Sequence, residues 1–314
     1  MKRLLHTSLD RMMYTMMHYL QWQLRHDVIS REELEDYLRI FRSWSRNDYF
    51  SLTPMKKLKV SQTFVTWESP SSSVFPENHR ARALFFPSSR KKSQGAPTLI
   101  ILHALMSASD LGYRRIAAKM NQRGWNVLFP HLPFHYSRKP QGHLHGSLAI
   151  SAHLIRTAET LRQAVQEIRQ LLHWSREQGS QRLALLATSY GGWIASLLLS
   201  LETIEIALLL QPIINLRRVT FESPLAASLG SLLQRHGITP AHLEEHAHLT
   251  EPSSTLPCSS RGKITIIGGK YDSLAPAEEL RAFASKWGAH YLEAEQGHFG
   301  YQAMQQALKL IELY

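Results

Sequence analysis

The sequence predicts an α/β protein with a mostly parallel, twisted sheet and helices on both faces. Short apolar runs alternate with segments of helical periodicity from residue 98 to residue 292. Strands that are buried on both faces and alternate with helices are typical of a parallel sheet. The chain has 314 residues, of which 44% are hydrophobic and 19% charged, so we expect a folded protein with a large core.

Residues 1–50 are predicted to form a helical extension ahead of a main domain at 51–314. Apolar residues recur at steps of three and four along the first helix, which is the spacing of one helix face. These residues are Leu5, Leu9, Met12, Met13, Met16, Leu20 and Leu24. A second helix begins at Ser30, which with Glu33 has the pattern of a capping box. We favour a helix hairpin packed on the main domain; the alternative is membrane contact through residues 1–24.

The next segments change to the period of two that indicates strands. Residues 58–67 and 80–86 are predicted strands, and the loop 69–78 between them is rich in Ser and Pro. The basic residues of 88–94 are predicted to lie at a solvated hairpin tip. So short a basic cluster does not indicate a nucleic-acid partner, and we expect none.

The alternating part begins at residue 98 and contains one long interruption. The predicted strands are 98–103, 125–129, 182–187, 204–210, 263–267 and 289–292, and the predicted helices are 110–123, 148–178 and 191–201. Residues 212–256 contain the helical patches 226–235 and 241–248 instead of a strand. We expect this insertion to form a small lid above the carboxyl edge of the sheet, with Leu225, Leu229, Leu232 and Leu233 on its apolar underside.

Charge and cysteine content limit the partners and the compartment. The net charge of +11 favours weak attraction to anionic surfaces but identifies no partner. Cys258 is the only cysteine, so no internal disulfide can form, which fits a reducing compartment. No apolar run approaches the ~20 residues of a membrane span. We therefore predict a cytoplasmic protein without a cofactor.

The most informative motif lies at residues 185–192, where an apolar strand runs directly into a helix. Ser189 stands in the turn between Ala187 and Gly191, the pattern of a nucleophile elbow with Ala in place of the first Gly. A strained turn tolerates only small residues two positions either side of the serine. The hydroxyl is then raised above the sheet at a helix N-terminus, where negative charge is favoured.

A serine hydroxyl needs a base, and the base needs a carboxylate to orient it. Asp272 follows the strand 263–267, and His298 follows the strand 289–292. Because a parallel sheet collects such loops at one edge, residues distant in sequence converge there. We predict that Ser189, Asp272 and His298 form a catalytic triad.

Acyl transfer also needs donors for the oxyanion. One is predicted to be the backbone N–H of Tyr190, directly after the nucleophile. The second is expected in the loop after strand 98–103, from Leu105 or, alternatively, Met106. Preorganised donors of this kind contribute ~3–4 kcal/mol each to the transition state.

Over about residues 58–314 the chain resembles the α/β-hydrolase superfamily, in its serine esterase and lipase-like part. The motifs that carry the resemblance are His103-Ala104-Leu105-Met106, Ala187-Thr188-Ser189-Tyr190-Gly191-Gly192, the segment 268–272, and Gly297-His298. The loop 129–140 also resembles a loop in poorly characterised members. Two features depart from the family: Gly is usual where Ala104 stands, and the N-terminal helices lie outside the common core.

The resemblance implies the α/β-hydrolase fold and cleavage of an ester, thioester or amide through an acyl-enzyme, with an ester ranked first. A serine nucleophile argues against the haloalkane dehalogenase and epoxide hydrolase branches.

A histidine-rich loop follows the strand 125–129. His131, His135, His143 and His145 have a spacing compatible with zinc, but no acidic residue or Cys lies nearby, so we expect no metal. We expect this loop to border the mouth of the active site. Arg138 and Lys139 then face solvent or meet an anionic group of the substrate, and His103 is a further candidate for substrate binding.

Three functions remain in competition. The first is an esterase acting on small acyl esters. The second is a lipid or phospholipid acyl hydrolase at a membrane surface, which the Met-rich helix, the lid and the basic charge favour. The third is a non-catalytic binding protein of the same fold, which the presence of Ser189, Asp272 and His298 together argues against.

Overall fold

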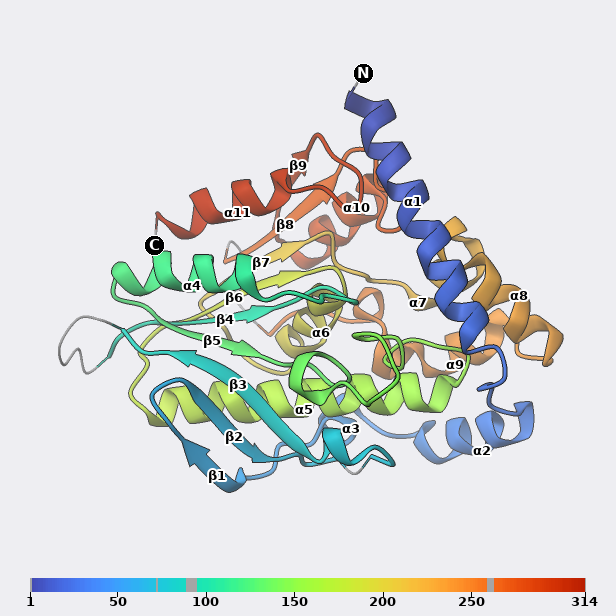
Figure 1. Cartoon of the computed structure of the whole chain (residues 1–314), viewed down its shortest axis with the longest axis horizontal. Helices are drawn as coiled ribbons and strands as arrows, with labels where there is room; N and C mark the ends of the chain where they lie inside the picture. Colours follow the sequence, from blue (N-terminus) through green and yellow to red (C-terminus); the bar gives the residue numbers. More distant parts are fainter. Residues whose placement is uncertain (1, 72, 89–94, 259–262, 314) are drawn as a thin grey trace.

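The computed structural model describes residues 2–71, 73–88, 95–258 and 263–313. Within these residues, one nine-stranded sheet has the order β1-β2-β3-β5-β4-β6-β7-β8-β9 (Figure 1). The first four strands in this order pair antiparallel, and all pairings from β5 onward are parallel. The predicted mostly parallel sheet is confirmed. Most of the predicted hairpin tip at 88–94 lies outside the described residues.

The strands follow the predicted apolar runs, with one exception. They are β1 (Lys56–Val60), β2 (Phe64–Glu68), β3 (Arg80–Phe86), β4 (Thr98–Leu102), β5 (Asn126–Pro130), β6 (Leu183–Thr188), β7 (Ile206–Leu210), β8 (Ile264–Gly269) and β9 (His290–Ala294). The single strand predicted at 58–67 is wrong, because the chain reverses between β1 and β2. The hydroxyl of Ser61 accepts the N–H groups of Thr63 and Phe64, and this stabilises the turn.

Helices cover both faces of the sheet, as predicted. They are α1 (Lys2–Gln23), α2 (Arg31–Phe41), α3 (Arg46–Tyr49), α4 (Leu111–Gln122), α5 (Leu154–Glu177), α6 (Tyr190–Leu199), α7 (Leu216–Glu222), α8 (Ala227–Arg235), α9 (Pro240–Thr250), α10 (Ala277–Trp287) and α11 (Gln302–Ile311). Alternate residues of β4 face opposite sides: Leu99 and Ile101 pack with α4 and α11, whereas Ile100 and Leu102 pack with α5, α6 and α10. Helix α5 begins later than predicted because the side chain of His153 caps it.

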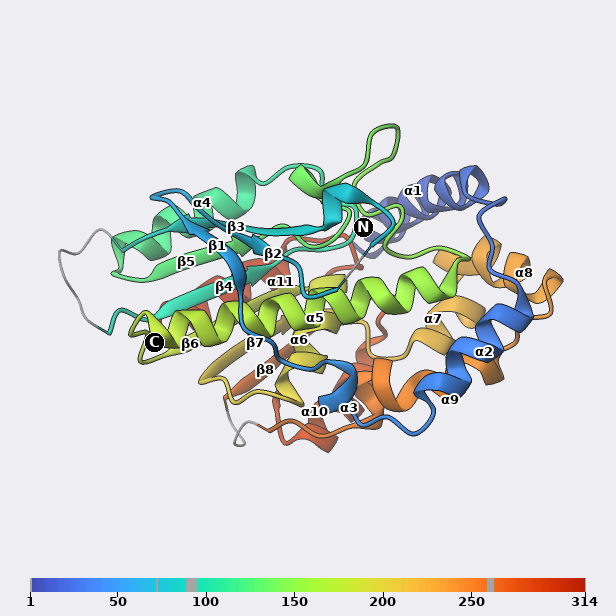
Figure 2. The same ribbon diagram turned by 90° about the horizontal axis from the view of Figure 1, so that it is seen from below.

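The N-terminal helices pack against the rest of the molecule. The capping box of Ser30 and Glu33 is confirmed at the start of α2. Figures 1 and 2 show α1 lying beside α8 at the carboxyl edge of the sheet, where His18 Nδ1 is 2.7 Å from Ser228 Oγ. The predicted inward stripe of α1 is partly wrong, since Met12 is 61% and Met16 38% exposed. The predicted stripe positions Leu5, Leu9 and Leu20 lie outside the described side chains.

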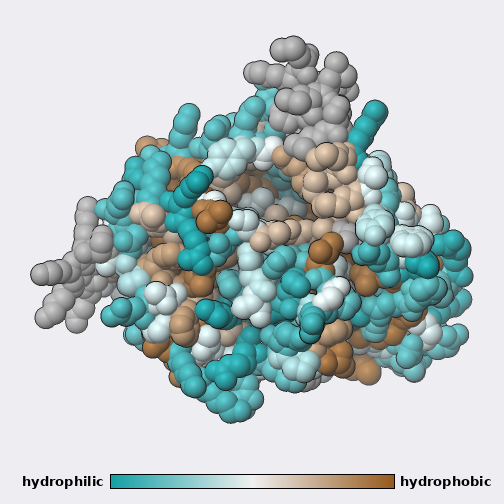
Figure 3. Space-filling view, in the orientation of Figure 1, coloured by the Kyte–Doolittle hydropathy of each residue, from teal (hydrophilic) through white to brown (hydrophobic). Residues whose placement is uncertain are grey.

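The segment 212–256, predicted as a lid, runs from β7 to β8 and carries α7, α8 and α9. Helices α8 and α9 lie where helical patches were predicted, whereas α7 was not predicted. Leu225, Leu229, Leu232 and Leu233 are all buried. No helix in the described part of the chain is long and apolar enough to cross a bilayer. On the face seen in Figure 3, hydrophilic and hydrophobic residues are interspersed.

Candidate active site

Ser189 occupies a strained turn between β6 and α6. Its φ of 52° and ψ of −110° lie outside the regions that non-glycine residues ordinarily adopt. The Ser189 N–H donates to the carbonyl of Leu210 on β7, at 2.8 Å, and so ties the turn to the neighbouring strand. A Cβ at Gly191 would lie 2.5 Å from the carbonyl oxygen of Leu102. A small residue is therefore required there because α6 begins directly against the end of β4.

The structure brings together the three residues of the predicted triad. Ser189 Oγ lies 2.8 Å from His298 Nε2, and His298 Nδ1 lies 2.7 Å from Asp272 Oδ2. All three side chains follow the carboxyl ends of parallel strands, β6, β8 and β9 respectively. Because a carboxylate only accepts hydrogen bonds, Nδ1 carries the proton and Nε2 of the neutral ring is free to accept from Ser189. This arrangement can take the proton of the hydroxyl as Ser189 attacks.

The carboxylate of Asp272 is held from several sides. Its Oδ1 accepts the backbone N–H groups of Leu274 and Ala275 at 2.8 and 2.9 Å. The side chain of Gln211 donates to its Oδ2 and also to the carbonyl of Gly297, at 3.0 Å. Gln211 thus connects the loop of the acid to the loop of the base. Gln211 was not among the predicted site residues, although it is a polar residue directly after an apolar strand at this edge.

A second carboxylate reaches the loop of His298 from the N-terminal helix. Asp10 on α1 is 3% exposed and accepts the backbone N–H groups of His298 and Phe299, at 3.2 and 3.4 Å. A Cβ at Gly297 would lie 2.5 Å from Asp10 Oδ2, so the absence of a side chain there permits this approach. Asp10 was not predicted as a site residue either, although its spacing places it on one helix face with Met13 and Met17. Helix α1 is therefore part of the site's framework.

Opposing effects act on the pKa of His298. Burial lowers it, but the charge of Asp272, its hydrogen bond to the ring and the charge of Asp10 raise it by more. The net result is a pKa above the ordinary value of 6.5 for a histidine side chain. The pKa of Asp10 is also raised, chiefly because burial disfavours its charged form.

The two candidates for the second oxyanion donor differ in the partners of their backbone N–H groups. The Met106 N–H already donates to His135 Nε2, at 3.3 Å. The Leu105 N–H has no acceptor among the described residues, and Leu105 lines the same pocket as Ser189. Tyr190 is the first residue of α6, and the first N–H groups of a helix lack intrahelical acceptors. Of the three predicted donors, only Met106 has an acceptor for its N–H among the described residues, so Leu105 and Tyr190 remain the candidates for the oxyanion hole.

Ser189 and His298 open into a largely apolar pocket of about 950 Å³, including the space at its open mouth. One wall comes from α1, through Met13 and Met17. Another comes from the segment 212–256, whose contributions include Val219, Leu225 and Leu229. The residues around the nucleophile thus offer apolar contact rather than charge.

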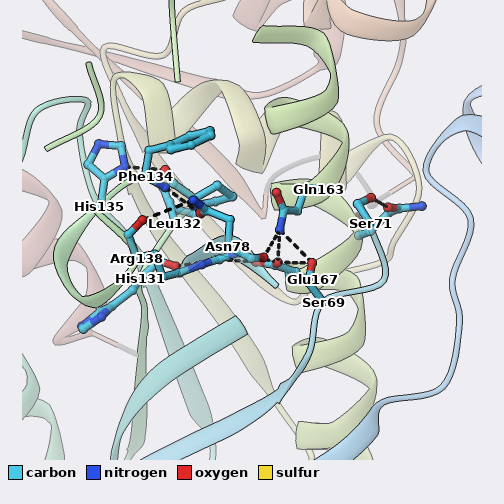
Figure 4. Close-up of polar contacts among 12 residues, drawn as sticks. Ser69, Ser71, Asn78, His131, Leu132, Phe134, His135, Arg138, Gln163 and Glu167 are labelled. Atoms are coloured by element: carbon cyan, nitrogen blue, oxygen red, sulfur yellow. Dashed lines mark hydrogen bonds and ion pairs between the residues drawn. The ribbon is translucent and has the colours of Figure 1, made fainter. Parts of the chain in front are cut away.

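Two of the three predicted substrate-binding residues lie elsewhere. Arg138 is 1% exposed, and its guanidinium donates to both carboxylate oxygens of Glu167 on α5, at 2.6 and 2.8 Å (Figure 4). His103 is fully buried, with its Nε2 accepting the N–H of Leu132. Lys139 donates to the carbonyl of His143 within its own loop. Both Arg138 and His103 were assigned wrongly, because their side chains are buried and bond to groups inside the protein.

The histidine-rich loop has no metal-binding arrangement in the described structure: among those residues, no group of three or more His, Cys, Asp or Glu side chains is placed to hold a metal ion. Instead, at least one ring nitrogen of His131, His135 and His145 bonds to a protein group. His131 Nδ1 lies 2.8 Å from Ser137 Oγ, and His145 Nδ1 accepts the N–H of Tyr136, also at 2.8 Å. The loop is therefore a packed structural element.

A family model described as "Alpha/beta hydrolase domain containing 18" matches residues 10–219, more than half of the chain. The chain belongs to this family. The match begins at Asp10, so the family's shared segment includes most of α1. The fold predicted from the resemblance is thereby confirmed, and membership in an alpha/beta hydrolase family supports hydrolase activity.

Comparison with individual proteins supports the fold and does not identify a substrate. The chain is 32% identical to "Uncharacterized protein Rv2627c" of Mycobacterium tuberculosis over 132 residues, which are 41% of this chain and 31% of that protein. It thus spans about a third of the length of that relative. The acetyl xylan esterase from Paenibacillus sp. R4 superposes with a TM-score of 0.62 at 13% identity, covering 93% of this chain and 99% of the esterase. Pyrococcus horikoshii acylaminoacyl peptidase superposes with a TM-score of 0.54 at 14% identity, covering 74% of this chain and 39% of the peptidase.

Proposed function

We propose that this chain is a serine hydrolase that cleaves a carboxylic ester through an acyl-enzyme. The observation that carries the proposal is the hydrogen-bonded series Ser189–His298–Asp272 at the floor of an apolar pocket. A thioester or an amide has the same reacting carbonyl and remains an alternative substrate. The apolar walls favour an acyl group without charge.

The geometry supports a two-step reaction. His298 Nε2 takes the proton of Ser189 as the oxygen attacks the ester carbonyl, and the Tyr190 and Leu105 N–H groups receive the negative oxygen. His298 then gives this proton to the departing alcohol, which leaves the acyl group on Ser189. A water molecule, deprotonated by the same ring, attacks the acyl-enzyme; the ring then returns this proton to Ser189 Oγ as the acid leaves. Asp272 stays ionised and stabilises the charged ring throughout.

We expect a fluorophosphonate probe to label the intact protein at Ser189 and to leave Ser189→Ala unlabelled. The probe reacts only with an activated serine, because an ordinary hydroxyl is a weak nucleophile. Ser231→Ala, which removes an exposed serine of α8, is the matched control and keeps full labelling. Labelling that survives Ser189→Ala assigns the nucleophile elsewhere. A folded wild-type protein that is neither labelled nor active on p-nitrophenyl esters supports the non-catalytic binding protein instead.

A lipid or phospholipid ester at a membrane surface is the second candidate substrate. The observation that favours it is a row of exposed apolar residues on the outer side of α1: Met12, Met16, Tyr19 and Trp22. Arg25 lies over the Trp22 ring at 4.1 Å, which places a cation beside this row. An amphipathic helix with apolar and basic residues of this kind binds anionic head groups. The inner side of the same helix lines the pocket.

If this second candidate is correct, the protein sediments with anionic vesicles and the variant Met12→Gln/Met16→Gln/Trp22→Gln does not. These substitutions keep α1 in place, whereas deleting residues 1–24 would also remove Asp10 and one wall of the pocket. Val74→Gln/Leu111→Gln, which changes two exposed apolar residues elsewhere, serves as the control. Equal sedimentation of all three proteins removes the membrane surface from the proposal and leaves the esterase.

A further inference from the structure

Two loops behind the active site are joined by a histidine ring. The β4 loop (residues 103–107) carries the oxyanion candidates, and the histidine loop (residues 131–147) follows β5. The link is the hydrogen bond in which His135 Nε2 accepts the Met106 N–H, at 3.3 Å. A second bond runs the other way, since His103 Nε2 accepts the Leu132 N–H, also at 3.3 Å. Each loop thus fixes a backbone group of the other.

The protonation state of His135 is set by its partners. Its Nδ1 lies 2.8 Å from the carbonyl of Pro133, which can only accept, so Nδ1 carries the proton. Nε2 then keeps a lone pair for Met106. Burial, followed by the neighbouring His103, lowers the pKa of His135 well below 6.5, so the ring is neutral near pH 7. The His135 ring also stacks on the ring of Tyr190, with centroids 6.1 Å apart.

Met106 needs such a partner because its backbone is strained. Its φ of 59° lies in the left-handed region, which non-glycine residues seldom adopt. Strain of this kind persists only where surrounding contacts hold it. The loop also leaves no room beside the ring: a Cβ at Gly146 would lie 2.2 Å from His135 Nε2 and 3.1 Å from the Met106 nitrogen. The fit around this one hydrogen bond is therefore close.

The histidine loop is itself anchored to the core. Arg138 joins it to Glu167 on α5 and also donates to the carbonyl of His131, at 3.0 Å (Figure 4). The N–H of Phe134 donates to Asn78 Oδ1, at 2.9 Å. Buried, charge-assisted contacts of this kind are rigid, so they hold the neighbouring His135 in place. A continuous set of contacts thus runs from α5 to the β4 loop.

We propose that His135 is a positioning residue for the oxyanion hole: by holding the Met106 N–H, it keeps the preceding Leu105 N–H turned toward Ser189. The proposal rests on the proposed serine hydrolase function. His135 does not touch the substrate and acts only through the β4 loop. Because the Leu105 donor is needed when charge develops on the carbonyl oxygen, its misplacement weakens transition-state binding and leaves ground-state binding intact.

The test compares two substitutions of His135. His135→Phe keeps a ring but removes the acceptor, and we expect it to lower kcat by about 10- to 100-fold, less than the loss of a whole oxyanion donor. KM should stay within about two-fold of the wild-type value, because His135 does not contribute to binding of the substrate in its ground state. His135→Gln retains an acceptor for the Met106 N–H and recovers part of the rate. His143→Phe, in the same loop but without a hydrogen bond to the β4 loop, is the matched control and keeps wild-type kinetics.

The affinity for a trifluoromethyl ketone inhibitor is a second measurement, and it distinguishes a positioning role of His135 from a merely structural one. The inhibitor forms a tetrahedral adduct with an oxyanion, so its affinity should fall in parallel with kcat across the His135 variants. Wild-type kcat in His135→Phe overturns the proposal, as does a loss shared equally by His135→Gln and His135→Phe. If His135→Phe does not fold, the smaller His135→Leu takes its place. Failure of Ser189 labelling in the wild type overturns the proposed function itself, whereas normal labelling with unchanged His135 variants overturns this inference alone.

Discussion

Replacing His298 by glutamine is expected to lower kcat by about 10⁴- to 10⁶-fold, by analogy with other triads. The ring is the group within 2.8 Å of Ser189 Oγ that can take its proton, and no other base is bonded to that hydroxyl in the described structure. Fluorophosphonate labelling should fall with kcat, since both reactions need the same activated oxygen. The measurement is kcat for a p-nitrophenyl ester, accompanied by thermal unfolding.

His290→Gln is the control for this experiment. His290 lies on β9, in the strand that precedes the loop of His298, and its side chain is exposed. It should keep wild-type kcat. A His298→Gln protein that is folded and retains more than about a hundredth of the wild-type kcat would contradict the assignment of the base, because general base catalysis alone contributes about 10²- to 10⁴-fold.

Asp272→Asn is expected to lower kcat by about 10³- to 10⁴-fold, because an amide no longer holds the ring in the tautomer that leaves Nε2 free. The pH dependence should change as well. His298 acts as a base only when neutral, so the rate rises as pH rises through its pKa. The charge of Asp272 raises that pKa, so its removal lowers the pKa and moves the acid limb of kcat/KM to lower pH.

The variant Asp10→Asn tests how much the second carboxylate, Asp10, contributes to the pKa of His298 compared with Asp272. Asp10 contributes less to the raised pKa of His298 than Asp272 does and bonds to backbone N–H groups rather than to the ring. An asparagine still offers an oxygen to those N–H groups. The Asp10 variant should therefore shift the acid limb in the same direction but less, and keep most of kcat. If Asp10→Asn lowers kcat more than Asp272→Asn does, the assignment of Asp272 as the orienting carboxylate is overturned.

Local patterns in the sequence were sufficient for most elements of the core and for placing Ser189, Asp272 and His298 at one edge. A strand that is buried on both faces has a continuous apolar run, and in a parallel sheet the residues after such runs must meet. Ser189 was identified because small residues flank it where a strand runs into a helix. These signals are contained in a few neighbouring residues. The turn at Ser61 was missed because no Gly or Pro marks it between residues 58 and 67.

Only the tertiary structure decided which partner each polar side chain has. Arg138 follows an aromatic-rich strand end and was expected at the surface, yet its charge is matched by Glu167, 29 positions along the chain. Asp10 was one of several charged residues in an N-terminal helix, and it bonds to a loop 288 positions away. Periodicity predicts which face of an element is apolar, but a buried polar group is stable only when a specific partner reaches it. Such partners come from segments that only folding brings together, so the chain determined its nucleophile locally and the framework of the site through packing.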